Sequence, residues 1–202
     1  FLLQHLVINL LSVISPNLFN QASHFMGTNT FVQYILQPVL IGGFFFHLIM
    51  GMVLDFKNRN ASSTKYAFND RNNSTWVSRN MIITGTMIFL FICLHFYDFW
   101  IPEINTKFIK GDWSGMHHGE FRYFAELQHK FVDLWRVLLY NLSFVFLSLH
   151  LLHGFQSSFQ SVGVRNKTVT PFIKKASYLY AILVPAGFVF IALYHYIVQV
   201  IL

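Results

Sequence analysis

The segment from Val39 to Leu54 constrains this chain more than any other feature, because it contains no charged residue and only one titratable side chain, His47. An imidazole in an apolar environment has an unpaired ring nitrogen, which is costly unless the fold or a ligand satisfies it. Gly43 and Gly51 lie one helical turn on either side of His47, so this face of the helix has room for a flat ligand. The segment therefore predicts an apolar helix whose histidine contacts a bound group.

The composition is that of an integral membrane protein. Of the 202 residues, 54% are apolar and 11% are charged, whereas an average soluble domain has about 25% charged residues; the mean hydropathy is +0.48. The length allows about five spans, and we expect one transmembrane domain over residues 1–202, with the beginning of its first helix before Phe1. The only cysteine, Cys93, lies in an apolar run, so we expect neither a disulfide nor an iron–sulfur cluster within this chain.

Apolar runs and turn residues predict five transmembrane helices in an all-α fold. We expect these helices over residues 1–14, 29–56, 76–100, 122–156 and 172–202. The proline-containing pairs at 15–16 and 101–102 are expected to end the first and third helices, and Pro38 to kink the second. Residues 17–28 are interpreted as an uncharged polar connection, and residues 103–121 as a loop of mixed charge.

Basic residues indicate how the helices cross the membrane, because cytoplasmic connections carry an excess of lysine and arginine. The excess lies between the second and third helices, at Lys57, Arg59, Lys65, Arg71 and Arg79, and between the fourth and fifth, at Arg165, Lys167, Lys174 and Lys175. We therefore expect both connections in the cytoplasm and the C-terminus outside. The net charge of +6 is then a signal of topology, and no nucleic-acid partner is needed to explain it.

Four of the predicted helices carry a histidine within an apolar run: His5, His47, His95 and His150. With this orientation and a rise of about 1.5 Å per residue, His5 and His95 lie in the outer half of the membrane, and the other two lie in the inner half. In an up-down bundle the first helix faces the third and the second faces the fourth. The fold therefore brings together two pairs at two depths, His5 with His95 and His47 with His150.

Two facing histidine pairs are the ligand set of two bis-histidine haems, because six-coordinate haem iron takes one imidazole from each side of the porphyrin plane. We expect two haems b stacked across the membrane, about 15 Å apart. Two other interpretations stay open, in which the histidines form hydrogen bonds between helices or a proton relay. His153, one turn from His150, is the alternative fourth ligand.

The remaining histidines lie in less specific positions. His195 is expected to be interfacial or hydrogen-bonded. In or beside the outer connections lie His24, His117, His118 and His129. The pair His117-His118 beside Glu120 has donors for a metal ion, but an exposed pair of this kind is more often solvated.

These motifs resemble those of the five-helix, dihaem cytochrome b membrane anchor of succinate:quinone oxidoreductases and fumarate reductases, over essentially the whole chain. Residues 4–9 resemble the first-ligand motif of its menaquinone-linked members, and residues 19–26 resemble the loop that follows. The other three ligand motifs are similar to His47 with Gly51, to Gly85 and His95 with Asp98, and to His150 with Gly154 and Gly163. The glycine spacing in the last motif favours His150 over His153.

The resemblance implies a function, cofactors and partners. The first four helices would enclose two haems b, with Gly51, Gly85 and Gly154 beside the ligands, in a bacterial cytoplasmic membrane. Electrons would pass between an iron–sulfur subunit and menaquinone, while a flavoprotein subunit with FAD carries the succinate and fumarate chemistry in either direction. This chain would be the enzyme subunit that does not bind the dicarboxylate, and the complex can form a homo-oligomer. Ser148 stands where members with a transmembrane proton pathway have a glutamate, so the resemblance does not extend to that pathway.

A quinone that takes up two electrons and two protons needs a titratable group near its carbonyl oxygens. Asp98 lies one turn outward from His95 and is the first candidate for the proton donor, with His24 as the second. Tyr97 and Trp100 are candidates to pack against the quinone ring. In the alternative interpretation, Asp98 pairs with a cation at the helix end and the two aromatic residues belong to the interfacial belt.

Two other classes of function fit parts of the pattern. A haem b subunit of a hydrogenase or formate dehydrogenase would share haem-bearing helices, but with fewer spans and a different histidine spacing. A haem-free transporter or structural membrane protein would use the histidines for hydrogen bonds only, and it would be colourless when purified.

Overall fold

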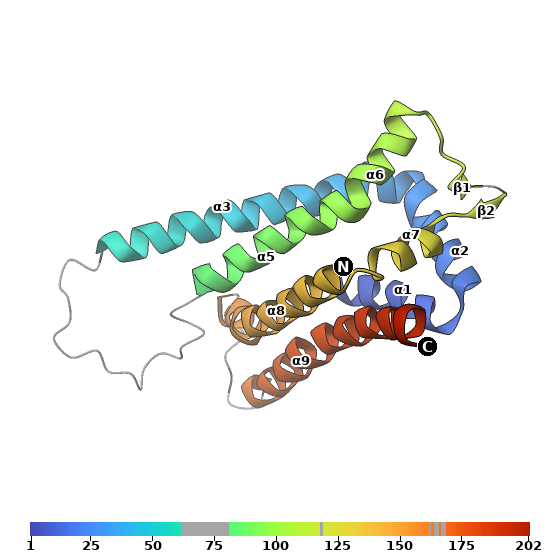
Figure 1. The fold of residues 1–202 in the computed structure, drawn as a ribbon. Coiled ribbons are helices and arrows are strands. Elements are labelled where there is room, and N and C mark those ends of the chain that lie inside the picture. Colours follow the sequence, from blue (N-terminus) through green and yellow to red (C-terminus); the bar gives the residue numbers. More distant parts are fainter. Residues whose placement is uncertain (62–80, 118, 162, 164–165, 167–168) are drawn as a thin grey trace.

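A computed structural model describes residues 1–61, 81–117, 119–161, 163, 166 and 169–202. Long helices lie side by side through the molecule, and the short elements gather at one end, which we call the α6 end (Figure 1). The strands of the described residues form one antiparallel hairpin, in which β1 (Met116–His117) pairs with β2 (Glu120–Phe121). The expected all-α class is confirmed, since this hairpin is a small addition to a helical protein.

Within the described residues, four helices are long and apolar enough to cross a membrane. They extend over Val32–Asn58, Met81–Ile109, Leu134–Phe159 and Val169–Ile201. The predicted first span corresponds to α1 (Leu2–Ile14), which is apolar but has only 13 residues, whereas a span needs about 20. The described residues therefore make an all-α membrane protein with four helices of spanning length and a shorter apolar helix.

Residues 17–28 form a helix, so their interpretation as a polar connection was wrong. α1 ends at Ser15 as expected, and α2 (Pro16–Thr28) begins directly after it. The Ser15 side chain accepts a hydrogen bond from the Leu18 N–H, and Pro16 occupies the first helical turn, where its missing N–H is not needed. The serine–proline pair thus ends one helix and begins the next.

The second predicted helix is longer than expected. A π-helical turn, η1 (Val32–Leu36), leads into α3 (Gln37–Ala61), which passes the predicted end at residue 56. The π turn lies directly before Pro38, where the Gln37 N–H bonds to the Val32 carbonyl. A π turn is a local adjustment that a helix can use beside a proline, which has no N–H to donate. Of the predicted loop 57–79, residues 62–79 lie outside the described residues.

The third helix continues through Pro102, so the predicted end at residues 101–102 was wrong. α5 (Met81–His95) is followed by a π turn, η2 (Phe96–Trp100), then α6 (Ile101–Ile104) and a further π turn, η3 (Asn105–Ile109). Pro102 directly follows the π turn η2, in which the Ile101 N–H bonds to the Phe96 carbonyl, and such a turn lets a helix continue past a residue that has no N–H. The predicted beginning of this helix, residues 76–80, lies outside the described residues.

The fourth predicted helix is divided in two, whereas the fifth agrees with the prediction. α7 (Tyr123–Lys130) is separated by a short break from α8 (Leu134–Ser161). At the break, the Asp133 carboxylate accepts a hydrogen bond from the Trp135 N–H at 3.1 Å, which is how a new helix is capped. α9 (Val169–Tyr196) continues into a last π turn, η4 (Ile197–Ile201), and contains Pro185.

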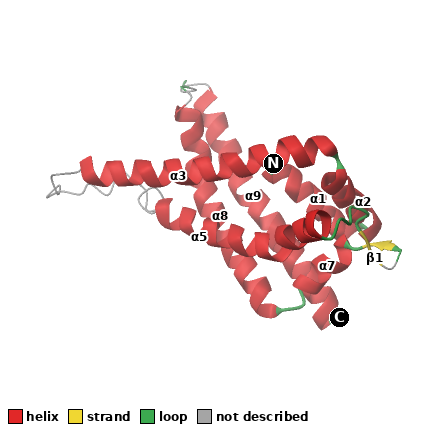
Figure 2. Ribbon diagram, turned by 90° about the horizontal axis from the view of Figure 1, so that it is seen from above, coloured by secondary structure: helices red, strands yellow, loops and turns green. Residues whose placement is uncertain are grey.

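The long helices pack unequally. α8 contacts α5 on one side and α9 on the other, and α1 contacts α2 and α9. Leu6, Phe144 and Phe188 join these helices in the buried core. α3 lies beside α5 (Figures 1 and 2), but no residue of its most hydrophobic window is buried. The expected bundle of the first four helices therefore differs from the structure, in which α9 belongs to the core and α3 is the most open helix.

Candidate functional site

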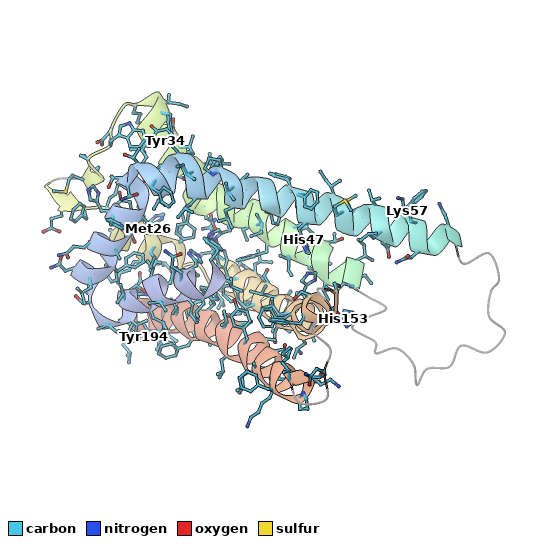
Figure 3. The ribbon with its side chains drawn as sticks, turned by 180° about the vertical axis from the view of Figure 1, so that it is seen from behind. Met26, Tyr34, His47, Lys57, His153 and Tyr194 are labelled. Atoms are coloured by element: carbon cyan, nitrogen blue, oxygen red, sulfur yellow. The ribbon has the colours of Figure 1, made fainter. Side chains whose placement is uncertain are left out.

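In the structure, the two histidines of each predicted pair lie next to each other. The rings of His5 on α1 and His95 at the end of α5 have centroids 5.8 Å apart and planes at 86°. The rings of His47 on α3 and His150 on α8 have centroids 6.2 Å apart and planes at 85°. The first pair lies toward the α6 end, and the second lies farther along α3 and α8 (Figure 3 labels His47).

The spacing of both pairs suits a metal ion between the rings. An imidazole nitrogen that ligates a metal lies about 2 Å from the ion, so two rings that hold one ion from opposite sides have centroids roughly 6 Å apart. Edge-to-face ring contacts have centroids about 4.5–7 Å apart as well. The hydrogen bonds of the rings and the space around them therefore decide whether a ligand fits.

The Thr84 hydroxyl favours one tautomer of the His150 imidazole. Its hydroxyl, fully buried on α5, donates to the Met81 carbonyl at 3.0 Å and so must accept from His150 Nδ1–H at 3.1 Å. Nε2 of the neutral His150 imidazole then carries the free lone pair that a metal needs. Ligand histidines usually donate their second N–H to such a partner. No sequence pattern relates these two residues, which lie on different helices.

The structure separates His150 from the alternative ligand His153. The Nε2 atom of His153 lies 3.4 Å from Ser157 Oγ, and that hydroxyl donates to the His153 carbonyl. His150 is the one that faces His47. The motif assigned Gly85 to His95, but a Cβ on Gly85 would lie 3.6 Å from Cε1 of His150, so this glycine packs beside the other pair.

The pair at the α6 end is deeper in the protein. Nδ1 of His95 is buried without a hydrogen-bond partner among the described residues, and a buried unpaired nitrogen of this kind calls for an explanation. His5 stacks on Phe1, with ring centroids 5.3 Å apart, and its Nδ1 lies 3.4 Å from the Asn9 amide. A ligand between the two rings would supply the missing partner of a ring nitrogen.

The predicted glycines differ in their surroundings. A Cβ on Gly43 or Gly51 would meet no atom within 4 Å, so both turns beside His47 face open space. A Cβ on Gly154 would lie 3.0 Å from Cε of Met81, so this glycine allows close helix packing. The open face of α3 and the two histidine pairs fit a flat group such as haem.

Asp98 lies in a cluster of charges next to His95. The carboxylate is 2% exposed, and its Oδ2 accepts a hydrogen bond from the Tyr140 hydroxyl at 3.0 Å. Nε of Arg136 lies 3.1 Å from Oδ2, and Nζ of Lys130 lies 3.7 Å from Oδ1. The alternative interpretation, in which Asp98 pairs with cations, thus describes its contacts. The sequence contained one sign of this ion pair, because Arg136 is a basic residue within an apolar stretch.

A groove of about 530 Å³ adjoins this cluster at Lys130. Its wall is mostly apolar and consists of Tyr97, Ile101, Pro102, Ile104, Asn105, Ile109 and Lys130. Lys130 reaches from the groove to Asp98, so a polar molecule in the groove would lie beside an ion pair. Of the predicted quinone residues, Tyr97, which is 64% exposed, lines the groove, and Asp98 is connected to it through Lys130.

The other two quinone candidates lie differently. The Trp100 ring stacks on Phe96 with centroids 5.1 Å apart, and its Nε1 is buried with no hydrogen-bond partner in the described part of the chain. The His24 ring contacts Phe121 and Tyr123, at centroid distances of 4.7 and 6.3 Å. No described contact joins His24 to the groove.

A second cluster of charges joins the short elements at the α6 end by ion pairs. Lys107 is buried, donates to the Gly27 carbonyl and pairs with Glu103 at 2.5 Å. Arg122 pairs with both Glu103 and Glu126, the latter at 2.7 Å. The interpretation of residues 103–121 as a mixed-charge loop was wrong for residues 103–109, which are helical in α6 and η3, and these ion pairs fix that part against α2 and α7.

The charges around Tyr123 also act on its hydroxyl. Burial, together with the negative charge of Glu103, raises the pKa of Tyr123 to about 12. The hydroxyl therefore stays protonated at neutral pH. His118 of the predicted His117-His118 pair lies outside the described residues, and those that are described contain no group of three or more side chains able to hold a metal ion.

Comparisons with known proteins give no relative. No family model matches the chain, and no curated protein or solved structure matches it.

Proposed function

We propose that the chain is the membrane-anchor and electron-transfer subunit of a succinate:quinone oxidoreductase or fumarate reductase. The observation that carries the proposal is the pair His47 and His150, whose rings face each other beside open space while Thr84 leaves Nε2 of His150 free. The facing rings of His5 and His95 support a second site of the same kind. The ligand motifs supply the resemblance to the family.

The four histidines would hold two haems b, which supply one-electron redox chemistry when bound. His5 and His95 would provide one set of axial ligands, and His47 and His150 the other. Thr84 holds the ring of His150 in one orientation and one tautomer. In a membrane, apolar surroundings would keep water from the pairs and so influence the redox potential.

The partners would bind at the end opposite α6. Lys57 in the last turns of α3 and Lys174 and Lys175 in the first turns of α9 are exposed at this end (Figures 1 and 3). By contrast, Lys107 and Arg122 at the α6 end are paired with acidic residues of the chain itself. We infer that the basic end faces the cytoplasm of a bacterium and binds the iron–sulfur subunit, with the FAD-bearing flavoprotein beyond it. Anionic lipid headgroups are the competing ligands.

Menaquinone would bind in the groove at Tyr97 and Lys130, near the His5 and His95 pair. The groove is mostly apolar, as a quinone ring requires, and the Lys130 ammonium can donate a hydrogen bond to a carbonyl oxygen. Asp98 lies behind Lys130. Lys130 would give a proton to the quinone, and Asp98, once it has itself taken up a proton, would return one to the Lys130 amine. Electrons would then leave from the pair nearest the groove.

Thr84→Val tests the ligand assignment, because it keeps the shape of the side chain and removes the hydroxyl. Without this partner the imidazole of His150 is less basic and stabilises ferric iron less, so the midpoint potential of one haem should rise. Haem affinity at this site should fall by about 10–100-fold. Potentiometric titration followed in the visible spectrum measures the midpoint potential, and titration of the protein with haem measures the affinity.

Thr86→Val is the matched control, since Thr86 is exposed on the same helix and its hydroxyl donates only to the Ile82 carbonyl at 2.8 Å. It should leave both haems unchanged. Equal potentials in the Thr84→Val and Thr86→Val proteins would show that His150 does not use Thr84 while it binds haem.

A further inference from the structure

The Leu6 side chain of α1 packs directly against the backbone of α9 at Gly187. A Cβ on Gly187 would lie 2.8 Å from Cδ1 and 3.0 Å from Cδ2 of Leu6. Small residues permit helices in membranes to pack at such short distances. Leu6 is buried and adjoins His5 in the sequence, so this contact packs α1 against α9 beside His5.

The next residue of α9 contacts the His5 ring itself. The rings of Phe188 and His5 have centroids 5.7 Å apart. Phe188 is buried and stacks on Phe144 of α8, with centroids 5.4 Å apart. The His5 imidazole therefore contacts both His95 at the end of α5 and Phe188 of α9.

A polar contact two turns along α1 joins the same helices. His195 is 1% exposed, and its Nε2 lies 2.8 Å from Oγ of Ser12. Because the Ser12 hydroxyl donates to the Asn9 carbonyl at 2.6 Å, it accepts from His195 Nε2–H. A hydrogen bond between two buried side chains has a narrow range of good geometry, so it sets the rotation of α1 about its axis.

The contacts have a common register. Ser12 follows His5 by seven residues, and His195 follows Phe188 by seven residues, which is two turns and one face of each helix. The paired contacts advance in the same direction along both helices, so α1 and α9 run parallel. A rotation or shift of α1 would break both contacts and move the His5 ring.

We propose that α9 positions the His5 ligand: Gly187 sets the distance, and His195 sets the rotation and register of α1, so that the His5 imidazole meets His95. The inference rests on the proposed haem function, since it gives α9 a role in the assembly of one of the two haem sites. His195 is a positioning residue that acts through Ser12. No described contact joins His195 to His47 or His150, the proposed ligands on α3 and α8.

The test is His195→Leu in the full chain with its partner subunits, examined by haem content, by EPR spectroscopy of the ferric haems and by redox titration. One low-spin signal should shift or be lost, and haem content should fall from two toward one per chain. The other signal should keep its position and potential. His195→Gln retains a donor for Ser12 and should restore the first signal, which a general loss of packing would not allow.

Two further variants keep the proposal testable if His195→Leu does not accumulate. Ser12→Ala removes the acceptor, and Gly187→Ala pushes against Leu6, so each should disturb the same signal. Ser177→Ala is the control, because Ser177 is buried on the same helix but contributes to neither contact. Unchanged spectra in all variants, or equal changes in both signals, would overturn the positioning role while two haems in the parent protein uphold the proposed function. A parent protein without haem would overturn the proposed function itself.

Discussion

His150→Ala should remove one haem and leave the other. The substitution deletes one of the two imidazoles that face each other between α3 and α8, while His5 and His95 lie on α1 and α5 and keep their contact. The remaining haem should retain the spectrum of a low-spin iron with two histidine ligands. Haem content per chain and the EPR spectrum of the oxidised protein measure the result.

His153→Ala is the matched control for this prediction. His153 lies one turn away on α8, and its Nε2 is near Ser157 rather than His47. The control should retain both haems. Two low-spin signals in His150→Ala combined with the loss of one in His153→Ala would transfer the ligand role to His153.

Asp98→Asn should lower quinone turnover strongly without loss of haem. The amide keeps the shape of the side chain but cannot deliver a proton, and removal of a general acid typically costs about 10²–10⁴-fold in rate. Both histidine pairs are left intact, so the visible spectrum should be unchanged. Succinate oxidation measured with an artificial acceptor, and quinone reduction measured in parallel, separate the two steps.

Arg136→Gln distinguishes proton supply from a structural ion pair. This variant removes one cation from the same carboxylate, at 3.1 Å in the structure, but leaves the acid in place. It should lose less quinone turnover than Asp98→Asn. Equal losses in the two variants, or unchanged turnover in Asp98→Asn, would show that Asp98 only holds η2 against α8.

The histidine pairing was accessible from the sequence because it depends on two simple quantities. The order of the helices decides which of them run in the same direction, and the position of each histidine within its apolar run gives its depth. His5 and His95, and likewise His47 and His150, agree in both, and the structure brings each pair together. The role of the four histidines as haem ligands stays a prediction.

The features that the sequence did not reveal depend on contacts between distant segments. Thr84 becomes the partner of His150 only when α5 packs on α8, and the cations around Asp98 come from Lys130 and Arg136. Pro102 was read as a helix end because the missing N–H is a local signal, whereas the π turn before it accommodates the proline. Apolar composition likewise gives no sign that α9 belongs to the core while α3 stays open.

The visible spectrum of the purified complex tests the central claim most directly. The complex should be coloured, should contain two haems b per copy of this chain, and should show both of them reduced when dithionite is added. Succinate should reduce at least one of them through the partner subunits. A colourless protein that binds no added haem would contradict the account and leave the four histidines as hydrogen-bonding residues of a haem-free membrane protein.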